Sequence, residues 1–287
     1  MPICEVPVKI FLAFLLFSFS LLQSFQYDLS VCAIFQDEAP YLKEWIDHHK
    51  RMGVQHFYLY NNNSKDDYLE VLMPFVYEGS IEIIQWPSHK EINDWKHYTF
   101  EVQTGAYNDA LNRSKNVSKW LALIDVDEYV FGVKERNVLK VLETHYPNVS
   151  GLCVNWQCYG TSHTCIKPGE KMLEKLVMKM KWDHPWNKHS KSIVQPLHVD
   201  HCPNPHYCVY KPGYFAIDSD GDRTDICCQE VNIDVIRINH YWTKDEWFFW
   251  NIKIPRYIQW GSSPEAAIKH AEEMNKEYDP ILSYPSR

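Results

Sequence analysis

Residues 119–131, with the sequence KWLALIDVDEYVF, decide the fold and locate the chemistry. The segment 120–124 is continuously apolar, which is typical of a strand that is buried on both faces of a sheet. Asp125 and Asp127 follow it directly. Residues two apart on an extended segment point to the same side, so we expect both carboxylates to hold one hard divalent cation. The alternative is a solvated acidic turn, because a D-x-D pattern is common by chance.

The residues before this segment alternate between strand and helix patterns. Apolar strands are expected at 29–35, 54–60 and 81–86, and helices at about 40–53, 68–79 and 98–111. This alternation predicts an α/β fold, as a single domain with a mostly parallel central sheet and helices on both faces. Ligands bind such sheets beyond the carboxyl ends of the strands, so the loops after Phe35, Tyr60 and Ile124 are the candidate site.

Composition and motifs exclude several classes of protein. The chain has 287 residues and a net charge of −8, with 45% hydrophobic and 15% aromatic residues. It is too apolar for a disordered chain and lacks the basic surface of a nucleic-acid-binding protein. It contains no G-x-G-x-x-G, no G-x-x-x-x-G-K-[ST] and no G-x-S-x-G motif. A Rossmann dehydrogenase and a P-loop NTPase are therefore disfavoured.

The N-terminus has the pattern of a targeting segment. Residues 10–22 (IFLAFLLFSFSLL) carry no charge and follow Lys9. The run is shorter than the roughly 20 residues of a spanning helix, which favours a signal peptide or a short signal-anchor. We expect this segment to occupy residues 1–27 and the folded domain residues 28–287. The expected location is the secretory pathway, as a single-pass Golgi membrane protein or a secreted one, with membrane contact only through this segment.

The cysteines and glycosylation sequons fit an oxidising compartment in part. Of the nine cysteines, Cys32 lies in an apolar strand and is expected to be a free core thiol. The best local disulfide candidates are Cys153, Cys158 and Cys165, followed by Cys202 and Cys208. The segment 198–208 (HVDHCPNPHYC) has no standard zinc spacing, so a Cys202–Cys208 disulfide is favoured there over zinc. Sequons occur at Asn62, Asn112, Asn116 and Asn148.

Three blocks of the sequence resemble glycosyltransferase family 92. They are CAIFQDEAPYLKEWIDHHKRMGVQHFYLYNNNS at 32–64, KWLALIDVDEYVF at 119–131 and RINHYWTK at 237–244. The resemblance implies a GT-A fold, a UDP-sugar donor, a glycan acceptor and Mn²⁺ or Mg²⁺ as cofactor. It also implies a Golgi or secretory location. Known activities in the family include β-galactosyl transfer with inversion.

The resemblance assigns roles to the metal and diphosphate residues. Asp125 would face the ribose or the metal, and Asp127 would be a metal ligand. Glu128 would support them from behind. His240, in the block INHYW, would complete the metal shell, with a buried core histidine as the alternative. Lys244 would meet the diphosphate, although a solvated surface lysine is an equally good interpretation.

The remaining donor-binding residues lie in the loops and the helix before this segment. The first-strand loop places Asp37 and Glu38 beside the nucleotide, although the family commonly has Asn-Glu at these positions. Asn62 and Asn63 would read the base, or serve only as turn residues. We expect Asn62 to carry no glycan, because a glycan would block that pocket. Gln103 and Asn108 would frame the donor, with helix packing as the alternative.

Acceptor binding and the catalytic base are less specified. The block NWQCYGTS at 155–162 resembles a family block and is expected to form the acceptor floor. An inverting transfer needs a base that takes the proton of the acceptor hydroxyl. The candidate carboxylates are Asp183, Asp200, Asp218, Asp220, Asp225 and Glu230. We favour the stretch 218–225, with Asp218, Asp220 and Asp225 as catalytic candidates.

The leading prediction is a metal-dependent, inverting hexosyltransferase, with galactose as a candidate sugar. One alternative is a nucleotide-sugar or glycan-binding protein that has lost turnover. Another is a metal-dependent phosphoester hydrolase using the same carboxylates, a class that usually needs more His and Asp ligands. No nucleic-acid partner is expected.

Overall fold

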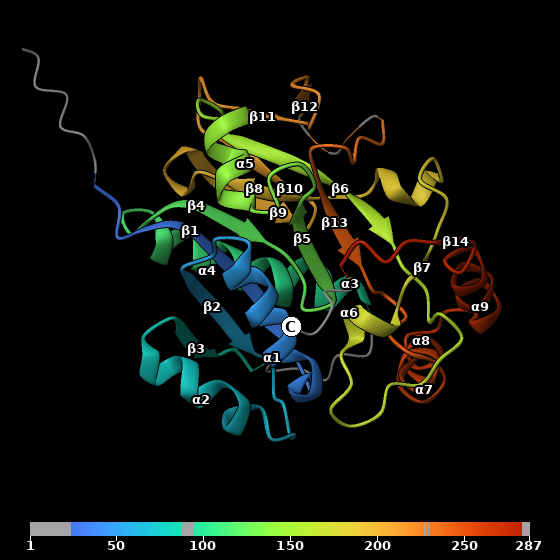
Figure 1. Cartoon of the computed structure of the whole chain (residues 1–287). Coiled ribbons are helices and arrows are strands. Elements are labelled where there is room, and N and C mark those ends of the chain that lie inside the picture. The colour runs from blue at the N-terminus through green and yellow to red at the C-terminus, as the bar shows by residue number, and fades with distance from the viewer. Residues whose placement is uncertain (1–23, 88–94, 225, 227, 229, 283–287) are drawn as a thin grey trace, which may run out of the picture.

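The computed structural model describes residues 24–87, 95–224, 226, 228 and 230–282 (Figure 1). The predicted signal peptide or anchor falls almost entirely on residues 1–23, outside this part of the chain. In the part that is described, no helix has both the length and the apolar character needed to cross a membrane.

The elements alternate in the first half of the chain and are mostly short strands in the second. The strands are β1 Tyr27–Phe35, β2 His56–Asn61, β3 Ile81–Gln85, β4 Ser118–Leu123, β5 Glu128–Gly132, β6 Gly151–Cys158, β7 Met178–Lys179, β8 Ser190–Val194, β9 Val199–Asn204, β10 Tyr207–Tyr210, β11 Ala216–Ile217, β12 Arg223–Thr224, β13 Ile236–His240 and β14 Glu277–Tyr278. The α-helices are α1 Ala39–Arg51, α2 Tyr68–Glu78, α3 Trp95–His97, α4 Thr104–Ser114, α5 Val138–His145, α6 Met172–Lys175, α7 Glu246–Phe248, α8 Ile254–Gln259 and α9 Pro264–Glu273. Two π-helical segments, Tyr98–Gln103 and Phe249–Lys253, lead into α4 and α8, and 3-10 turns occupy Pro185–Lys188 and Pro196–His198.

The central sheet is mixed and mostly parallel, as predicted. Its main path runs β12-β11-β6-β8-β4-β1-β2-β3, and β13 joins β5 to β6. Strands β1 to β4 pair in parallel with one another. Strand β8 lies antiparallel between β4 and β6, so β6 runs in the same direction as β4. The predicted α/β class and the strands and helices of the first half are confirmed, although the second strand begins at His56 rather than at residue 54.

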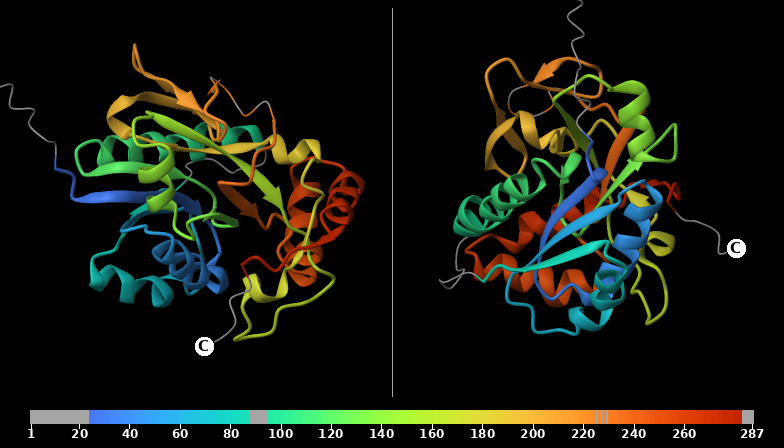
Figure 2. Two further views of the ribbon diagram at one scale, coloured as in Figure 1. Left: turned by 45° about the horizontal axis from the view of Figure 1, so that its top comes forward. Right: turned by 90° about the vertical axis from the view of Figure 1, so that its left-hand side faces the viewer.

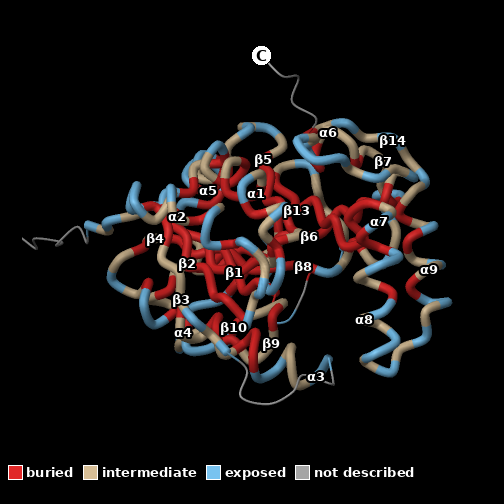
Figure 3. The backbone as a smooth tube through the Cα atoms, turned by 90° about the horizontal axis from the view of Figure 1, so that it is seen from below, coloured by how far each residue is buried: buried red, intermediate tan, exposed pale blue. Residues whose placement is uncertain are grey.

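Two apolar cores cover the two faces of the sheet. Alternate side chains of β1, such as Val31 and Ala33, pack in one core with α1, α2 and α5. Cys32 and Ile34 point the other way, into a core formed with α4 and the β9–β10 hairpin. This alternation is the two-residue period of a strand, and it explains why strands buried on both faces are continuously apolar. Figure 2 shows the two helical layers on either side of the sheet, and Figure 3 shows the buried residues concentrated along its strands.

Strand β5 has β13 on one side and helix α1 on the other. Trp45 Nε1 donates to Glu128 O at 2.8 Å, and His48 Nε2 lies 2.8 Å from Val130 O. Val130 N donates to His49 Nε2 at 3.3 Å. Side chains of α1 therefore satisfy backbone groups that a neighbouring strand would otherwise pair.

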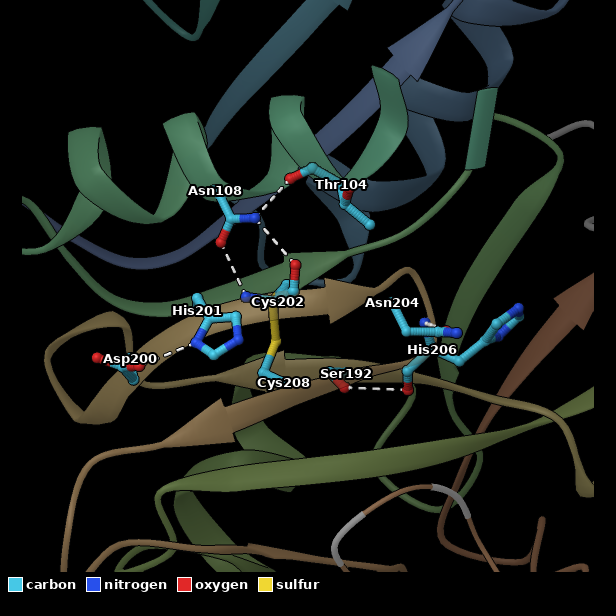
Figure 4. The surroundings of a disulfide bond; sticks show 9 residues. All are labelled: Thr104, Asn108, Ser192, Asp200, His201, Cys202, Asn204, His206 and Cys208. Carbon is cyan, nitrogen blue, oxygen red and sulfur yellow. Dashed lines mark hydrogen bonds and ion pairs between the residues drawn. A yellow bond between two sulfur atoms is a disulfide. The ribbon is translucent and has the colours of Figure 1, made fainter. Parts of the chain in front are cut away.

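The β9–β10 hairpin is closed by the predicted Cys202–Cys208 disulfide (Figure 4). Cys32 is a buried free thiol, as expected. The expectation that Cys158 and Cys165 belong to a local disulfide is wrong: both are free thiols, Cys158 buried at the end of β6 and Cys165 exposed in the loop beyond it.

Candidate functional site

The two aspartates lie on a turn rather than on an extended segment. Glu128 N donates to Asp125 O at 3.1 Å, and Asp125 N donates to Glu128 Oε2 at 2.9 Å. This turn connects β4 to β5, and it sends the two carboxylates to different partners. The expectation that Asp125 and Asp127 point to the same side, which required extended backbone, is therefore wrong.

Asp125 is held by three donors from three elements. Gln103 Nε2 donates to Oδ1 at 2.5 Å, and the Tyr107 hydroxyl does so at 3.1 Å. Lys191 Nζ, from β8, lies 2.9 Å from Oδ2. Gln103 therefore lies in the candidate site, where it binds Asp125; its contact with a donor stays a prediction. The ammonium group of Lys191 thus occupies the position beside Asp125 Oδ2 that a metal ion would need.

Lys191 is a site residue that the sequence analysis missed. Its side chain is only 1% exposed, and its Nζ also lies 3.8 Å from Glu128 Oε2. Burial alone would lower the pKa of Lys191, but Asp125 and Glu128 outweigh burial and raise it. The lysine is therefore a charged group in a buried position, which the segment SKSIV does not reveal by its pattern.

Glu128 is fully buried behind the turn. Its Oε1 has no hydrogen-bond partner among the described residues. Burial raises the pKa of Glu128 well above its ordinary range, and Lys191 only partly opposes this shift. Glu128 therefore supports the turn from behind, as the sequence predicted.

Asp127 lies against His240 and a second lysine. His240 Nε2 is 3.6 Å from Asp127 Oδ1, and Lys253 Nζ is 3.8 Å from Oδ2. Burial would raise the pKa of Asp127, but His240, Lys253 and Lys244 together bring it well below its usual range. An ionised carboxylate and an imidazole nitrogen facing each other are suitable donors for Mn²⁺.

His240 reaches this position because β13 pairs with both β5 and β6. It lies opposite Glu128 on one side and Cys158 on the other. Its ring is 4.2 Å from the ring of Trp156, and its Nδ1 is buried without a hydrogen-bond partner in the described chain. Asp127 and His240 thus fit a shared cation as a pair, whereas Asp125 does not join them. Within the described residues no group of three or more His, Cys, Asp and Glu side chains is arranged to hold a metal ion.

The loops after β1 and β2 lie together at the same edge of the sheet. Asp37 N donates to Ser64 Oγ, and Lys65 N donates to Asp37 Oδ1 at 2.6 Å, so Asp37 links the two loops. Asn62 is fully buried and donates to Trp86 O at 2.8 Å, while its Oδ1 has no partner among the described residues. Asn63 is exposed with φ at 59°. The burial of Asn62 agrees with the expectation that it carries no glycan.

Lys244 was expected to meet the diphosphate, but its side chain is engaged elsewhere. Its Nζ binds Glu38, and the ammonium ion lies 4.0 Å from the ring centre of Tyr41 and 4.2 Å from that of Phe248. The side chain is 1% exposed. The assignment of Lys244 to the diphosphate is therefore wrong for this structure, because a carboxylate and two rings enclose the ammonium ion. Glu38 is occupied by the same contact.

Asn108 has a structural partner. Its Nδ2 donates to Cys202 O at 2.9 Å, and its Oδ1 accepts from Cys202 N at 2.8 Å (Figure 4). The amide thus pairs helix α4 with strand β9 next to the disulfide. Helix packing, the alternative interpretation of Asn108, describes this residue better than donor binding.

The favoured catalytic stretch lies at the wrong end of the sheet. Strand β11, just before Asp218, pairs with residues 151 and 152 at the start of β6, whereas His240 pairs with its end. Six residues of strand separate these positions by about 20 Å. Asp218 Oδ1 accepts from the backbone of Asp220 and Asp222, and Asp220 binds Asn232. The catalytic assignment of Asp218 and Asp220 is therefore wrong, and Asp225 lies outside the described residues.

Asp183 lies at the correct end. The fully buried Asn187 accepts from Cys158 N at 3.0 Å and donates to Lys181 O and Trp182 O at 2.9 and 3.0 Å. These bonds hold the loop before β8 against the end of β6, and the exposed Asp183 belongs to that loop. Trp182 beside it is 55% exposed.

Comparisons with known proteins agree with the family resemblance. A sequence model of Glycosyltransferase family 92 matches residues 27–282. Similar proteins from Arabidopsis thaliana include "Glycosyltransferase family 92 protein At1g27200", 27% identical over 158 residues, and "Galactan beta-1,4-galactosyltransferase GALS2", 25% identical over 203 residues. These matches cover 50% and 65% of this chain but only 25% and 37% of those proteins. Among solved structures, S. aureus TarS 1-349 covers 86% of this chain and 70% of that chain at 9% identity, with a TM-score of 0.41.

Proposed function

The chain belongs to glycosyltransferase family 92, and we propose that it is a metal-dependent, inverting hexosyltransferase that uses a UDP-sugar donor and a glycan acceptor. The observation that carries the proposal is the contact between Asp127 and His240 at the carboxyl ends of the strands. Galactose is the first sugar to test, because two relatives are named galactan beta-1,4-galactosyltransferases.

Asp127 and His240 would hold the metal, with the diphosphate and water as the remaining ligands. A divalent cation bound there would offset the negative charge that grows on the diphosphate as it leaves. Asp125 orients rather than ligates, because Gln103, Tyr107 and Lys191 fix its carboxylate. It remains available to a ribose hydroxyl through its partly exposed edge.

We assign the catalytic base to Asp183. In an inverting transfer the acceptor oxygen attacks the anomeric carbon while the bond from that carbon to the diphosphate oxygen breaks. The electron pair of that bond leaves with UDP, and the proton of the acceptor hydroxyl passes to the Asp183 carboxylate. Support for Asp183 is its place in the loop that Asn187 fastens to the end of β6.

The acceptor would lie on the exposed ring of Trp182, a turn residue of this loop that is 55% exposed. Trp156 of β6 is buried against His189 and His240 and would support the site from behind. Aromatic faces suit the C–H surfaces of sugars. We extend the proposal to the secretory pathway, which is supported by the Cys202–Cys208 disulfide and by exposed sequons at Asn112 and Asn148.

The test is UDP release from a panel of UDP-sugars with Mn²⁺, with and without a panel of galactan and other glycan oligosaccharides. We expect release from one sugar, stimulated by one acceptor, and loss of release with EDTA. Asp127→Asn and Asp183→Asn should each lower kcat at least 100-fold. Asp234→Asn, an exposed matched control, should match the wild type.

Three other outcomes would contradict the proposal. Release that does not depend on an acceptor would indicate a hydrolase. Mn²⁺-dependent UDP binding without release from any donor would indicate a binding protein. Full activity of Asp183→Asn would contradict the assignment of Asp183 as the base, but not the proposed transferase activity.

A further inference from the structure

A second cation, Lys253, lies beside the pair Asp127 and His240. Its side chain is 14% exposed, and its Nζ is 3.8 Å from Asp127 Oδ2 and 4.8 Å from the ring centre of Trp242. A distance of 3.8 Å is too long for a hydrogen bond. In the described chain no acceptor lies within hydrogen-bond distance of this ammonium group, which can donate three hydrogen bonds.

Arg256 follows Lys253 by three residues on the continuous helical segment Phe249–Gln259, so the two side chains share one face of that segment. Burial raises the pKa of both Glu38, after β1, and Tyr98, before α4, and the guanidinium of Arg256 opposes both shifts. The ring of Tyr98 stacks on Trp260 at 6.2 Å, which joins the end of α8 to the helical segment before α4. The guanidinium of Arg256 also has no hydrogen-bonded acceptor among residues 24–87, 95–224 and 230–282.

We propose that Lys253 and Arg256 bind the diphosphate of the nucleotide donor. The proposal rests on the proposed function and gives the diphosphate role to residues other than Lys244, whose ammonium ion is enclosed by Glu38, Tyr41 and Phe248. Lys253 differs from Lys244 in having unfilled donors and a path to solvent.

The chemistry of the pair matches a diphosphate. A lysine ammonium binds phosphate oxygens as a point charge, and an arginine guanidinium binds them in a bidentate manner. Lys253 lies next to Asp127, where a metal-bound diphosphate would lie, and Arg256 shares its helical face. The C-terminal segment α7–α8, beside the ends of β6 and β13 in Figure 1, would thus close the donor site with its two cations.

The test is isothermal titration calorimetry of the full protein with Mn²⁺, using UDP, uridine and inorganic pyrophosphate. The variants are Lys253→Gln, Arg256→Gln and the charge-keeping Lys253→Arg, with the exposed Lys269→Gln as the matched control. Lys253→Gln should raise the Kd for UDP and for pyrophosphate by about 10- to 100-fold, as expected for a lost charge-assisted hydrogen bond. Uridine affinity should not change. Lys253→Arg and Lys269→Gln should stay within about threefold of the wild type.

The outcomes separate this inference from the proposed function. Wild-type protein that binds UDP, with both glutamine variants unchanged, would overturn the inference and leave the function. An equal loss of UDP and uridine binding would also overturn it, because the damage would not be specific for phosphate. Pyrophosphate binding that depends on Lys253, without binding of UDP, would support the inference and contradict the UDP-sugar donor. Binding of neither ligand would contradict both.

Discussion

At the scale of single residues, two lysine side chains lie beside the two aspartates of the turn. Lys191 Nζ lies 2.9 Å from Asp125 Oδ2, and Lys253 Nζ lies 3.8 Å from Asp127 Oδ2. Each lysine is largely removed from water, so each depends on a nearby carboxylate or ligand for its stability. The two aspartates of the turn therefore have different tasks, one orienting and one available to a cation.

Lys191→Met should destabilise the protein by about 3 kcal/mol, because it leaves Asp125 and the buried Glu128 without their cation. The measurement is urea unfolding monitored by tryptophan fluorescence. Adding Asp125→Asn to Lys191→Met should restore part of this loss, because one unpaired charge is removed. Lys269→Met, on the exposed face of α9, serves as the control and should stay within about 0.5 kcal/mol of the wild type. An unchanged Lys191→Met would show that the pair contributes no stability.

At the scale of elements, the disulfide hairpin β9–β10 carries a side chain to the site. Cys202 is fastened to helix α4 through Asn108, and the hairpin tip places His206 against Ser190 O at 2.9 Å. The His206 ring lies 5.4 Å from Trp156. The hairpin thus connects helix α4 to Trp156, which packs against His240.

Replacing both cysteines of this hairpin, Cys202→Ser with Cys208→Ser, should lower the free energy of unfolding by about 2 kcal/mol. The cysteines are six residues apart, and closing so short a loop removes a modest amount of entropy from the unfolded chain. Thermal and chemical unfolding would measure the loss. The exposed free thiol of Cys165 offers the matched control, since Cys165→Ser should leave stability unchanged. Equal stability of the double variant and the control would remove the structural role of the disulfide.

At the scale of the whole molecule, the halves of the chain differ in how far sequence predicts them. Strands 29–35 and 120–124 were predicted because their residues are mostly or wholly apolar, and strand 81–86 because it lies between two helix patterns. The antiparallel strand β8 and the strand β13 were not predicted, since their partners are distant in sequence. In addition, the β8 sequence SKSIV has no alternation of polar and apolar residues. Asp127 was singled out by its place directly after a buried strand, whereas His240 entered the candidate site only through the family resemblance. Lys253 had no sequence signal, because its proximity to Asp127 depends on where the segment Phe249–Lys253 folds.

The fold as a whole should lose stability in mild acid through its buried histidines. Burial lowers the pKa of His48 to about 4 and that of His49 well below its usual range. In the unfolded chain histidine has a pKa of about 6.5, so the unfolded state binds more protons between these values. Stability is therefore full above pH 6.5 and falls as pH drops toward 4. His48 alone should cost about 2 kcal/mol at pH 5 relative to neutral pH.

The measurement is the free energy of unfolding in urea from pH 4.5 to 8. His48→Gln should flatten part of the slope, because glutamine can donate to Val130 O without titrating. The control His163→Gln, at a side chain that is 72% exposed, should keep the wild-type slope. A His48→Gln profile as steep as that of the wild type would place the acid sensitivity elsewhere.

The pairing of β13 with both β5 and β6 has a consequence for synthesis on the ribosome. The turn that carries Asp127 ends in β5, and β13, the one strand that pairs with β5 among the described residues, follows more than a hundred residues later. Strands β1 to β4 can pair before β13 emerges, because all four lie ahead of Asp127 in the chain. The contact between Asp127 and His240 cannot form at that stage, since His240 itself belongs to β13. Catalytic activity should therefore begin only once β13 has left the exit tunnel. A nascent chain stalled before that point should have strands β1 to β4 paired but no activity.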